Sequence, residues 1–282
     1  MYKIGLSSCG KTINEELFAA YAAAGIDVME ISPGMDAYAS LNYEEMAALS
    51  RKYGVEIRSF HLPFMPFDKI DISRPELAEA SIAYLSELIG RAAEVGIKIF
   101  VVHPSGEPIA EADRPARMAQ AKESLARLAE VARTFGAVIA VEDLPRTCLG
   151  RSADDMEELI GADSDLRICF DTNHLLTGDP VELVRRLGHK IVTTHVSDYD
   201  RVNERHWLPG EGVVDWTAIL AALKDVGYDG PWLYELGFVC PNTILREREL
   251  TCHDFADNAK ALFAGEKPPI LSRPKPNLGM WE

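Results

Sequence analysis

The chain has 282 residues, of which 47% are hydrophobic and 26% are charged, and it contains 20 Gly and 16 Pro. This composition is that of a folded globular protein, and it excludes the collagen-like, disordered and coiled-coil classes. The 29 basic and 44 acidic residues give a formal net charge of −15. Nucleic acids and anionic membranes attract positively charged proteins, so we expect neither as a partner.

The start of the chain and its cysteines indicate the compartment. The opening MYKIGLSSCG carries one lysine and no apolar run, so it does not resemble a secretory signal. No segment approaches the roughly 20 apolar residues that a membrane span needs. The five cysteines are an odd number without a CxxC pair. We therefore expect a reduced, cytoplasmic protein without a disulfide framework.

Eight short runs rich in Val, Ile and Phe predict strands that are buried on both faces. They span residues 3–7, 27–32, 56–63, 97–104, 138–145, 166–174, 191–198 and 231–238. Amphipathic helical patterns follow them at residues 14–24, 43–52, 76–94, 116–135, 154–160, 180–187, 216–226 and 247–264. Eight strand–helix units in about 250 residues predict an α/β protein with a single (β/α)8 TIM barrel, here over residues 1–264.

Two features complete the expected architecture. A doubly wound sheet is the alternative fold, but no Gly-rich dinucleotide or phosphate-binding turn follows any strand, so no nucleotide cofactor is expected. Residues 265–282 contain four prolines and form a tail that cannot be helical. Leu278, Met280 and Trp281 in this tail are compatible with docking, for example in a homo-oligomer, and equally with a frayed terminus.

Ionisable residues end six of the eight predicted strands. They are His61, His103, Glu142, Asp171, His195 and Glu235. In a (β/α)8 barrel the carboxyl ends of the strands open onto one mouth, where active sites are built. Burying so many charges there costs several kcal/mol each unless something compensates. A helix cap or an arginine partner would explain any one of them, which leaves an ordinary structural role open for each residue alone.

Four of these residues lie on four consecutive strands, namely Glu142, Asp171, His195 and Glu235. A cation shared among them is a simpler explanation than four separate structural roles. Three oxygen donors, one nitrogen and no thiolate suit Mn²⁺, Mg²⁺, Co²⁺ or Fe²⁺ better than a structural zinc. The mouth is expected to hold further histidines and two arginines, which suit an oxygen-rich or anionic substrate. These are His61, His103, His174, His206, Arg201 and Arg205.

Across residues 3–264 the sequence resembles the xylose-isomerase-like TIM barrel superfamily of sugar isomerases, ketose 3-epimerases, inosose dehydratases and apurinic endonucleases. The segments that carry the resemblance are VVHP (101–104), VEDLP (141–145), FDTNH (170–174), HVSDYDR (195–201), PGEGVVDW (209–216) and LYELG (233–237). The resemblance implies a metal-dependent sugar (phosphate) isomerase or epimerase, with a small sugar or polyol as its substrate.

The epimerase branch implies a role for each matching residue. Its metal ligands match Glu142, Asp171, His195 and Glu235, and we expect Mn²⁺ first, with Zn²⁺ among the alternatives. Its paired glutamates, here Glu142 and Glu235, move a proton on and off the substrate through a metal-stabilised enediolate. Substrate oxygens would be held by His174 and Arg201, with help from His61, His103 and His206.

Three alternatives stay open at this stage. Lyase or dehydratase chemistry can follow from the same enediolate. The apurinic endonuclease branch uses a three-zinc site, and His61, His103 and the Glu204-Arg205-His206 segment fill its additional places, although Glu204 stands where that branch has Asp. The net charge of −15 argues against such a nuclease. A non-catalytic accessory barrel that only holds metal is the third alternative.

Overall fold

A computed structural model describes residues 1–276 and 278–279. Its main strands are β1 (Ile4–Ser7), β2 (Val28–Ile31), β3 (Glu56–His61), β4 (Ile99–Val102), β5 (Val138–Glu142), β6 (Arg167–Asp171), β7 (Ile191–His195) and β8 (Trp232–Tyr234). Its α-helices are α1 (Glu15–Ala24), α2 (Tyr43–Tyr53), α3 (Pro75–Glu94), α4 (Arg114–Thr134), α5 (Ala153–Ile160), α6 (Pro180–Leu187), α7 (Trp216–Asp225) and α8 (Cys252–Phe263). Two short 3-10 helices lie at Met35–Ser40 and Gly188–Lys190.

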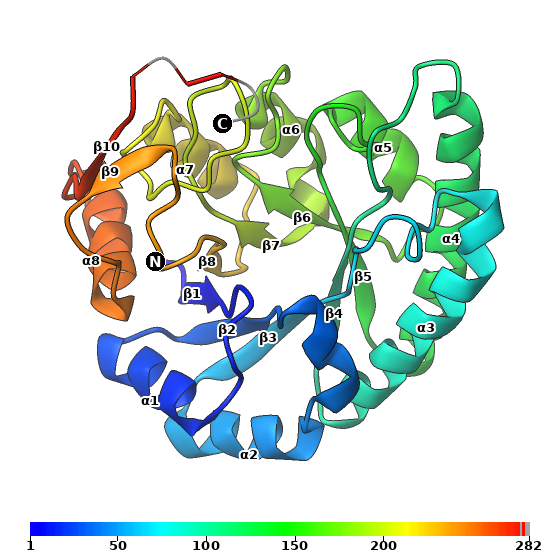
Figure 1. Ribbon diagram of the computed structural model, residues 1–282, viewed down its shortest axis with the longest axis horizontal. Coiled ribbons are helices and arrows are strands. Elements are labelled where there is room, and N and C mark those ends of the chain that lie inside the picture. The colour runs from blue at the N-terminus through cyan, green and yellow to red at the C-terminus, as the bar shows by residue number, and fades with distance from the viewer. Residues whose placement is uncertain (277, 280–282) are drawn as a thin grey trace.

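The eight strands form one parallel sheet in the order β7-β6-β5-β4-β3-β2-β1-β8. A parallel bridge between Val196 and Tyr234 joins β7 to β8 and brings the two edges of the sheet together. The helices surround this sheet on the outside (Figure 1). The structure thus confirms the predicted single (β/α)8 TIM barrel, and each predicted strand and helix overlaps an observed one.

The strands are rich in apolar residues because both faces of the sheet are covered, as the sequence predicts. Every residue of β1 and of β4 is buried. Between the sheet and the outer helices lie large buried side chains such as Phe18, Phe60 and Phe255. This packing fixes the strand ends in space, so side chains at the carboxyl ends of the strands have little freedom to move. No helix in the described part of the chain is long and apolar enough to cross a membrane.

The C-terminal region differs from the prediction at one point. The last helix begins at Cys252 rather than near residue 247, because β9 (Ile244–Arg246) precedes it and pairs antiparallel with β10 (Ser272–Pro274). Thr251 and Asp254 form a capping box, in which each side chain accepts from the backbone N–H of the other, and this box sets the helix start.

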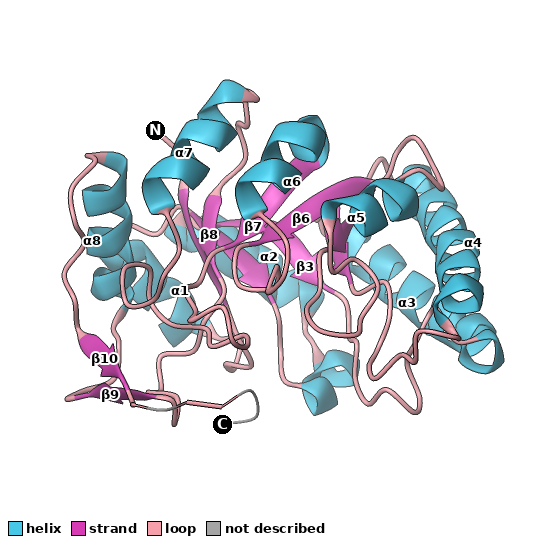
Figure 2. Ribbon diagram, turned by 90° about the horizontal axis from the view of Figure 1, so that it is seen from above, coloured by secondary structure: helices cyan, strands magenta, loops and turns pink. Residues whose placement is uncertain are grey.

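The tail docks on its own barrel in the part that the structure describes. The N–H of Lys275 donates to the Thr243 carbonyl at 3.0 Å, and the Arg205 guanidinium donates to the Gly279 carbonyl at 2.6 Å. The β9–β10 ribbon and the tail lie on the loop-rich side of the barrel, opposite the N-terminus (Figure 2). Met280 and Trp281, named above as candidate docking residues, lie outside the described residues.

The capping box of α8 predicts a pH-dependent contribution to stability. Hydrogen bonds from Arg248 lower the pKa of Asp254 to about 2, so the carboxylate stabilises the fold above its unfolded pKa of about 4 and loses that effect as the pH falls towards 2. Because Arg248 is half exposed, we expect Asp254→Asn to lower the free energy of unfolding by about 1 kcal/mol at pH 7. Urea denaturation at pH 7 and at pH 3 measures this change, which should shrink at the lower pH.

Asp257→Asn is the matched control on the same helix. Its carboxylate is largely exposed and lies 3.5 Å from the Lys260 ammonium, so we expect a change within about 0.5 kcal/mol. Equal effects of the two substitutions, or an Asp254→Asn effect of the same size at both pH values, would contradict the prediction.

Candidate functional site

The four residues predicted as metal ligands meet at the mouth of the barrel. Glu142, Asp171 and His195 are the last residues of β5, β6 and β7, and Glu235 directly follows β8. Each of the four offers a donor atom within 4.8 Å of the others. The Nδ1 atom of His195 lies 3.1 Å from the Glu142 carboxylate, 3.2 Å from Glu235 and 3.9 Å from Asp171. The barrel thus brings three carboxylates around one imidazole nitrogen.

The charge balance of this cluster fits a divalent cation. Asp171 is fully buried, and its Oδ2 atom is a buried acceptor without a hydrogen-bond partner among the described residues. Burial raises the pKa of Asp171 to about 6, and the nearby Glu142 and Glu235 add to this effect. Burial also favours the neutral form of Glu142, but His195 and His103 overcome it and hold the Glu142 pKa well below its usual value. The buried carboxylates are stabilised by positive charge close to them, and a bound divalent ion would supply such charge.

Sequence reasoning missed one residue of the cluster, Glu30 on β2. Both oxygens of its buried carboxylate lie 3.0 to 3.1 Å from His195 Nε2, and the Ser59 hydroxyl donates to it at 2.8 Å. His195 Nε2 therefore carries a proton, and Nδ1 is left to face the other carboxylates. Histidines that bind metals are commonly oriented by such a carboxylate behind the ring. A single glutamate inside the apolar run VMEI was the available signal.

A second group lies beside the first and shares Glu142 with it. The Nε2 atoms of His61 and His103 each lie 3.1 Å from the same Glu142 oxygen, Oε2. His61 Nδ1 donates to the Leu62 carbonyl at 2.8 Å, which orients the ring. The ring of His103 stacks on Phe64 with centroids 4.1 Å apart. The structure therefore brings both predicted mouth histidines to the ligand cluster.

A third group joins His174, Glu204 and His206, whose donor atoms also lie within 4.8 Å of one another. His174 Nδ1 donates to the Asp143 carbonyl at 2.7 Å, so its Nε2 faces Glu204 at 3.1 Å. His206 Nδ1 lies 3.2 Å from the Glu235 carbonyl, which can only accept. Each histidine thus has its Nδ1 atom held by a backbone carbonyl, and the Nε2 atom of His174 pairs with Glu204.

Glu142, Glu235 and the residues of the second and third groups line a cavity of about 660 Å³, a size typical of small-molecule sites. The rest of the lining is largely apolar and includes Met35, Phe64, Phe67 and Leu236. Arg146 also lines the cavity, and sequence reasoning did not single it out. Its guanidinium binds the carboxylates of Glu107 and Glu204, with 2.8 Å to the latter.

The two arginines expected at the mouth are not among the residues that line the main cavity. Arg201 is exposed and lines an adjoining cavity of about 400 Å³, which shares Arg146 and His174 with the main one. Its role as a substrate-binding residue remains a prediction. The Arg205 side chain is fully buried and pairs with Asp200 at 2.9 Å. It lies between Glu204 and His206 in the sequence but contacts the C-terminal tail through Gly279.

The loop that carries Glu204 and His206 is organised by Asp198. This buried carboxylate accepts from the N–H groups of Tyr199, Gly210 and Val214 and from the Trp216 indole, at 2.8 to 3.1 Å. Gly212 must be glycine, because a Cβ there would lie 2.2 Å from the Tyr199 carbonyl and 2.3 Å from Asp198 Oδ1. The Gly210-Glu211-Gly212 turn therefore shapes this loop around a carboxylate.

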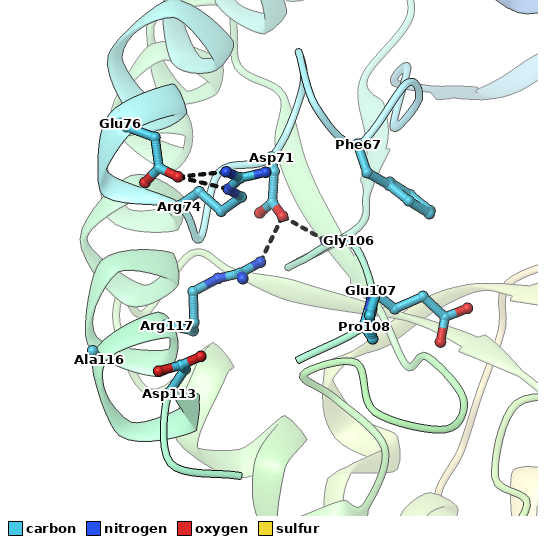
Figure 3. Close-up of a pocket in the computed structure, with 10 residues that line it drawn as sticks. All are labelled: Phe67, Asp71, Arg74, Glu76, Gly106, Glu107, Pro108, Asp113, Ala116 and Arg117. Atoms are coloured by element: carbon cyan, nitrogen blue, oxygen red, sulfur yellow. Dashed lines mark hydrogen bonds and ion pairs between the residues drawn. The ribbon is translucent and has the colours of Figure 1, made fainter. Parts of the chain in front are cut away.

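A second carboxylate supports the opposite rim. Asp71 accepts from the Gly106 N–H at 3.1 Å and from Arg117 at 2.6 Å, which ties the β3–α3 and β4–α4 loops together (Figure 3). Phe67 lies close to Gly106, where a Cβ would be 2.8 Å from its ring. The pocket drawn in Figure 3 has a volume of about 430 Å³ and shares Phe67 and Glu107 with the main cavity. This network therefore holds one wall of the candidate site.

Comparisons with known proteins agree with this fold. The family described as xylose isomerase-like TIM barrel matches residues 18–245. The uncharacterised protein MJ1311 of Methanocaldococcus jannaschii is 29% identical over 198 residues, 67% of each chain. The D-psicose 3-epimerase of Enterocloster bolteae is 24% identical over 245 residues, 78% of each chain. The crystal structure of a D-tagatose 3-epimerase-like protein superposes with a TM-score of 0.77 at 23% identity, covering 93% of this chain and 96% of that one.

The hydrogen bonds to Asp198 predict that replacing this carboxylate by an amide destabilises the fold. Asp198→Asn replaces one acceptor oxygen by an amide nitrogen, which would face N–H donors that it cannot satisfy. We expect the free energy of unfolding to fall by about 2 to 3 kcal/mol, measured by urea denaturation. Asp229→Asn, at an exposed position, is the control and should change stability by less than about 0.5 kcal/mol. Similar values for both variants would show that the loop does not depend on this carboxylate.

Proposed function

The chain belongs to the family of xylose isomerase-like TIM barrels, and from this membership we propose that it is a divalent-metal-dependent sugar epimerase or isomerase. One observation supports the proposal above all others. The carboxylates of Glu142 and Glu235 both lie within 3.2 Å of His195 Nδ1 at the floor of a cavity large enough for a sugar. Two carboxylates so placed can exchange a proton with one substrate carbon.

In this proposal Glu142, Asp171, His195 and Glu235 hold the metal. Three of these four donors are carboxylates, which favours Mn²⁺ over a thiolate-seeking metal. The bound ion would stabilise negative charge on the substrate oxygens next to the reacting carbon. Glu30 acts behind the ligands, because its hydrogen bond fixes the ring orientation of His195.

The remaining residues orient the substrate and move its proton. Glu235 is 17% exposed and Glu142 is 1% exposed, and both line the cavity. We propose that one of them removes the proton next to the carbonyl and the other returns it. His61, His103, His174 and His206 present ring nitrogens to the cavity and would hold hydroxyl groups. A lyase or dehydratase would begin with the same proton removal and then expel a hydroxide from the neighbouring carbon.

A multinuclear phosphodiesterase is the second candidate, and one observation favours it. The groups His61–His103–Glu142, Glu142–Asp171–His195–Glu235 and His174–Glu204–His206 each have the size of a metal site. Together they could hold three ions. The net charge of −15 opposes binding to a polyanionic backbone, so we rank this function below sugar chemistry. In either case we propose residues 1–264 as the catalytic barrel and 265–282 as its tail.

The number of bound metals distinguishes the two candidates. We expect about one divalent ion per chain after mild purification, measured by elemental analysis, because the sugar chemistry needs a single ion. Asp171→Asn should lower occupancy at least tenfold, since a ligand charge is lost, whereas Asp229→Asn should leave it unchanged.

Other outcomes of this measurement would favour the alternatives. Two or three ions per chain, together with cleavage of an abasic DNA duplex at physiological salt, would favour the nuclease. Bound metal without turnover of any sugar, together with capture of a partner chain, would favour an accessory barrel.

The proposed proton transfer predicts exchange with solvent. In D₂O, deuterium should enter the carbon next to the carbonyl in product and in recovered substrate, followed by NMR with a panel of ketoses. Glu142→Gln and Glu235→Gln keep an oxygen donor but remove the base, so the exchange rate should fall by about 10² or more. The panel can begin with the ketoses D-psicose, D-tagatose and L-ribulose.

Glu182→Gln on the exposed face of α6 is the control and should exchange at the wild-type rate. Metal content must be measured in each variant, because lost metal would imitate a lost base. If both variants retain metal and exchange deuterium at the wild-type rate, the assigned roles are wrong.

A further inference from the structure

The third group of the candidate site differs in charge from the four ligands on β5 to β8. Those four ligands combine three carboxylates with one imidazole. The third group consists of His174, Glu204 and His206, and it therefore combines one carboxylate with two imidazoles. The carboxylate of Glu204 also has a cation beside it already. The two groups thus differ in how much they gain from an added metal ion.

The cation beside Glu204 is the guanidinium of Arg146. One Nη atom of Arg146 lies 2.8 Å from Glu204 Oε1, and the other oxygen, Oε2, lies 3.1 Å from His174 Nε2. Each oxygen of Glu204 therefore faces a nitrogen of a basic side chain. Because arginine does not lose its proton in proteins, the positive charge of Arg146 is permanent.

Contacts with two further loop residues hold the Arg146 guanidinium in place. Its Nε lies 3.0 Å from both oxygens of Glu107 on the β4–α4 loop. Its Nη1 donates to the side-chain oxygen of Asn203 on the β7–α7 loop at 2.7 Å. The side chain of Arg146 is 13% exposed, and its backbone has a left-handed φ of 53°, a conformation that concentrates at functional sites. The guanidinium is thus fixed beside Glu204 and does not move aside freely.

An ion bound by the third group would come close to this guanidinium. Metal–oxygen bonds are about 2 Å long, so an ion on Glu204 Oε1 would lie within about 5 Å of the Arg146 nitrogen that is 2.8 Å from the same oxygen. Like charges at that separation repel each other, and Glu107 offsets only part of this repulsion. To bind the ion, Glu204 would also have to give up the contact with Arg146 or with His174. Both effects lower the affinity of the group for a divalent ion.

We propose that Arg146 takes the place of a metal ion at the third group. Its guanidinium holds Glu204 against His174, lowers the affinity of the group for divalent ions and thereby favours binding at the ligands on β5 to β8. Arg146 is in this role a positioning residue that limits the number of ions in the barrel. The inference rests on the proposed donor groups, but it does not depend on turnover of a sugar.

The test uses Zn²⁺ as the probe, titrated by calorimetry into the metal-stripped full-length protein. His206→Gln removes a donor of the third group and none of the donors on β5 to β8. In the wild-type background we expect this substitution to leave the zinc stoichiometry unchanged. Arg146→Met removes the charge and should add one zinc site per chain, with an affinity about tenfold or more above that of the wild-type third group. The added site should disappear in the double variant Arg146→Met/His206→Gln.

Two controls separate the charge of Arg146 from other effects of its replacement. Arg146→Lys keeps the positive charge and should not gain the site. Arg151→Met removes an arginine of the same loop, one that pairs with Glu111 at 2.8 Å, and should bind zinc as the wild type does. Circular dichroism of each variant confirms that it is folded. Since the variants are compared with one another, ions held by the second group do not affect the result.

Three outcomes would overturn the inference. The first is a wild-type stoichiometry that falls by one ion in His206→Gln, because the third group would then already hold a metal. This comparison decides the matter even if Arg146→Met does not fold. The second is a folded Arg146→Met that gains neither a site nor affinity, and the third is a gain in Arg146→Lys equal to that in Arg146→Met. If the ligands on β5 to β8 bind no ion but Arg146→Met still gains one, the proposed function fails and the inference stands.

Discussion

The burial of carboxylates at the carboxyl ends of the strands is the constraint on which the rest of this structure depends. Glu30, Glu142 and Asp171 are almost completely inaccessible to solvent, and ionised groups in such places need opposite charge close by. Here the imidazole of His195 lies among them, with Glu30 on one nitrogen and the other carboxylates around the second. Protons or a cation can supply the remaining counter-charge.

Fixed ring orientations are the second consequence of this arrangement. The Nδ1 atoms of His61, His174 and His206 each face a backbone carbonyl, which accepts but cannot donate. Their ring orientations are therefore fixed, and the Nε2 atoms of His61 and His174 face the carboxylates of Glu142 and Glu204. A site whose donors are positioned before the ligand arrives loses less entropy on binding. The same preorganisation would serve a metal, a sugar hydroxyl or both.

Loops at the mouth depend on carboxylates that lie outside the reacting cluster. Asp198 accepts hydrogen bonds from four N–H groups in the loop that carries Glu204 and His206. Asp71 joins the β3–α3 loop to the β4–α4 region. Arg205 connects the segment between Glu204 and His206 to the C-terminal tail. The acidic character of the chain is thus partly explained by the fold itself, since these acids hold the backbone in place and do not need an external partner.

The sequence by itself determined the barrel. The periodicities of strands and helices and the cap residues depend on neighbouring residues in the chain, so they can be recognised without knowledge of tertiary contacts. It also determined the cluster on β5 to β8, since parallel strands bring their carboxyl ends to one mouth. Only the tertiary structure revealed Glu30, whose partner His195 is 165 residues away in the chain. Likewise, only the three-dimensional path of the loops placed Arg146 at the site and Arg201 in a separate cavity. Loop side chains are positioned by long-range ion pairs and left-handed backbone, and neither has a periodic signature in the sequence.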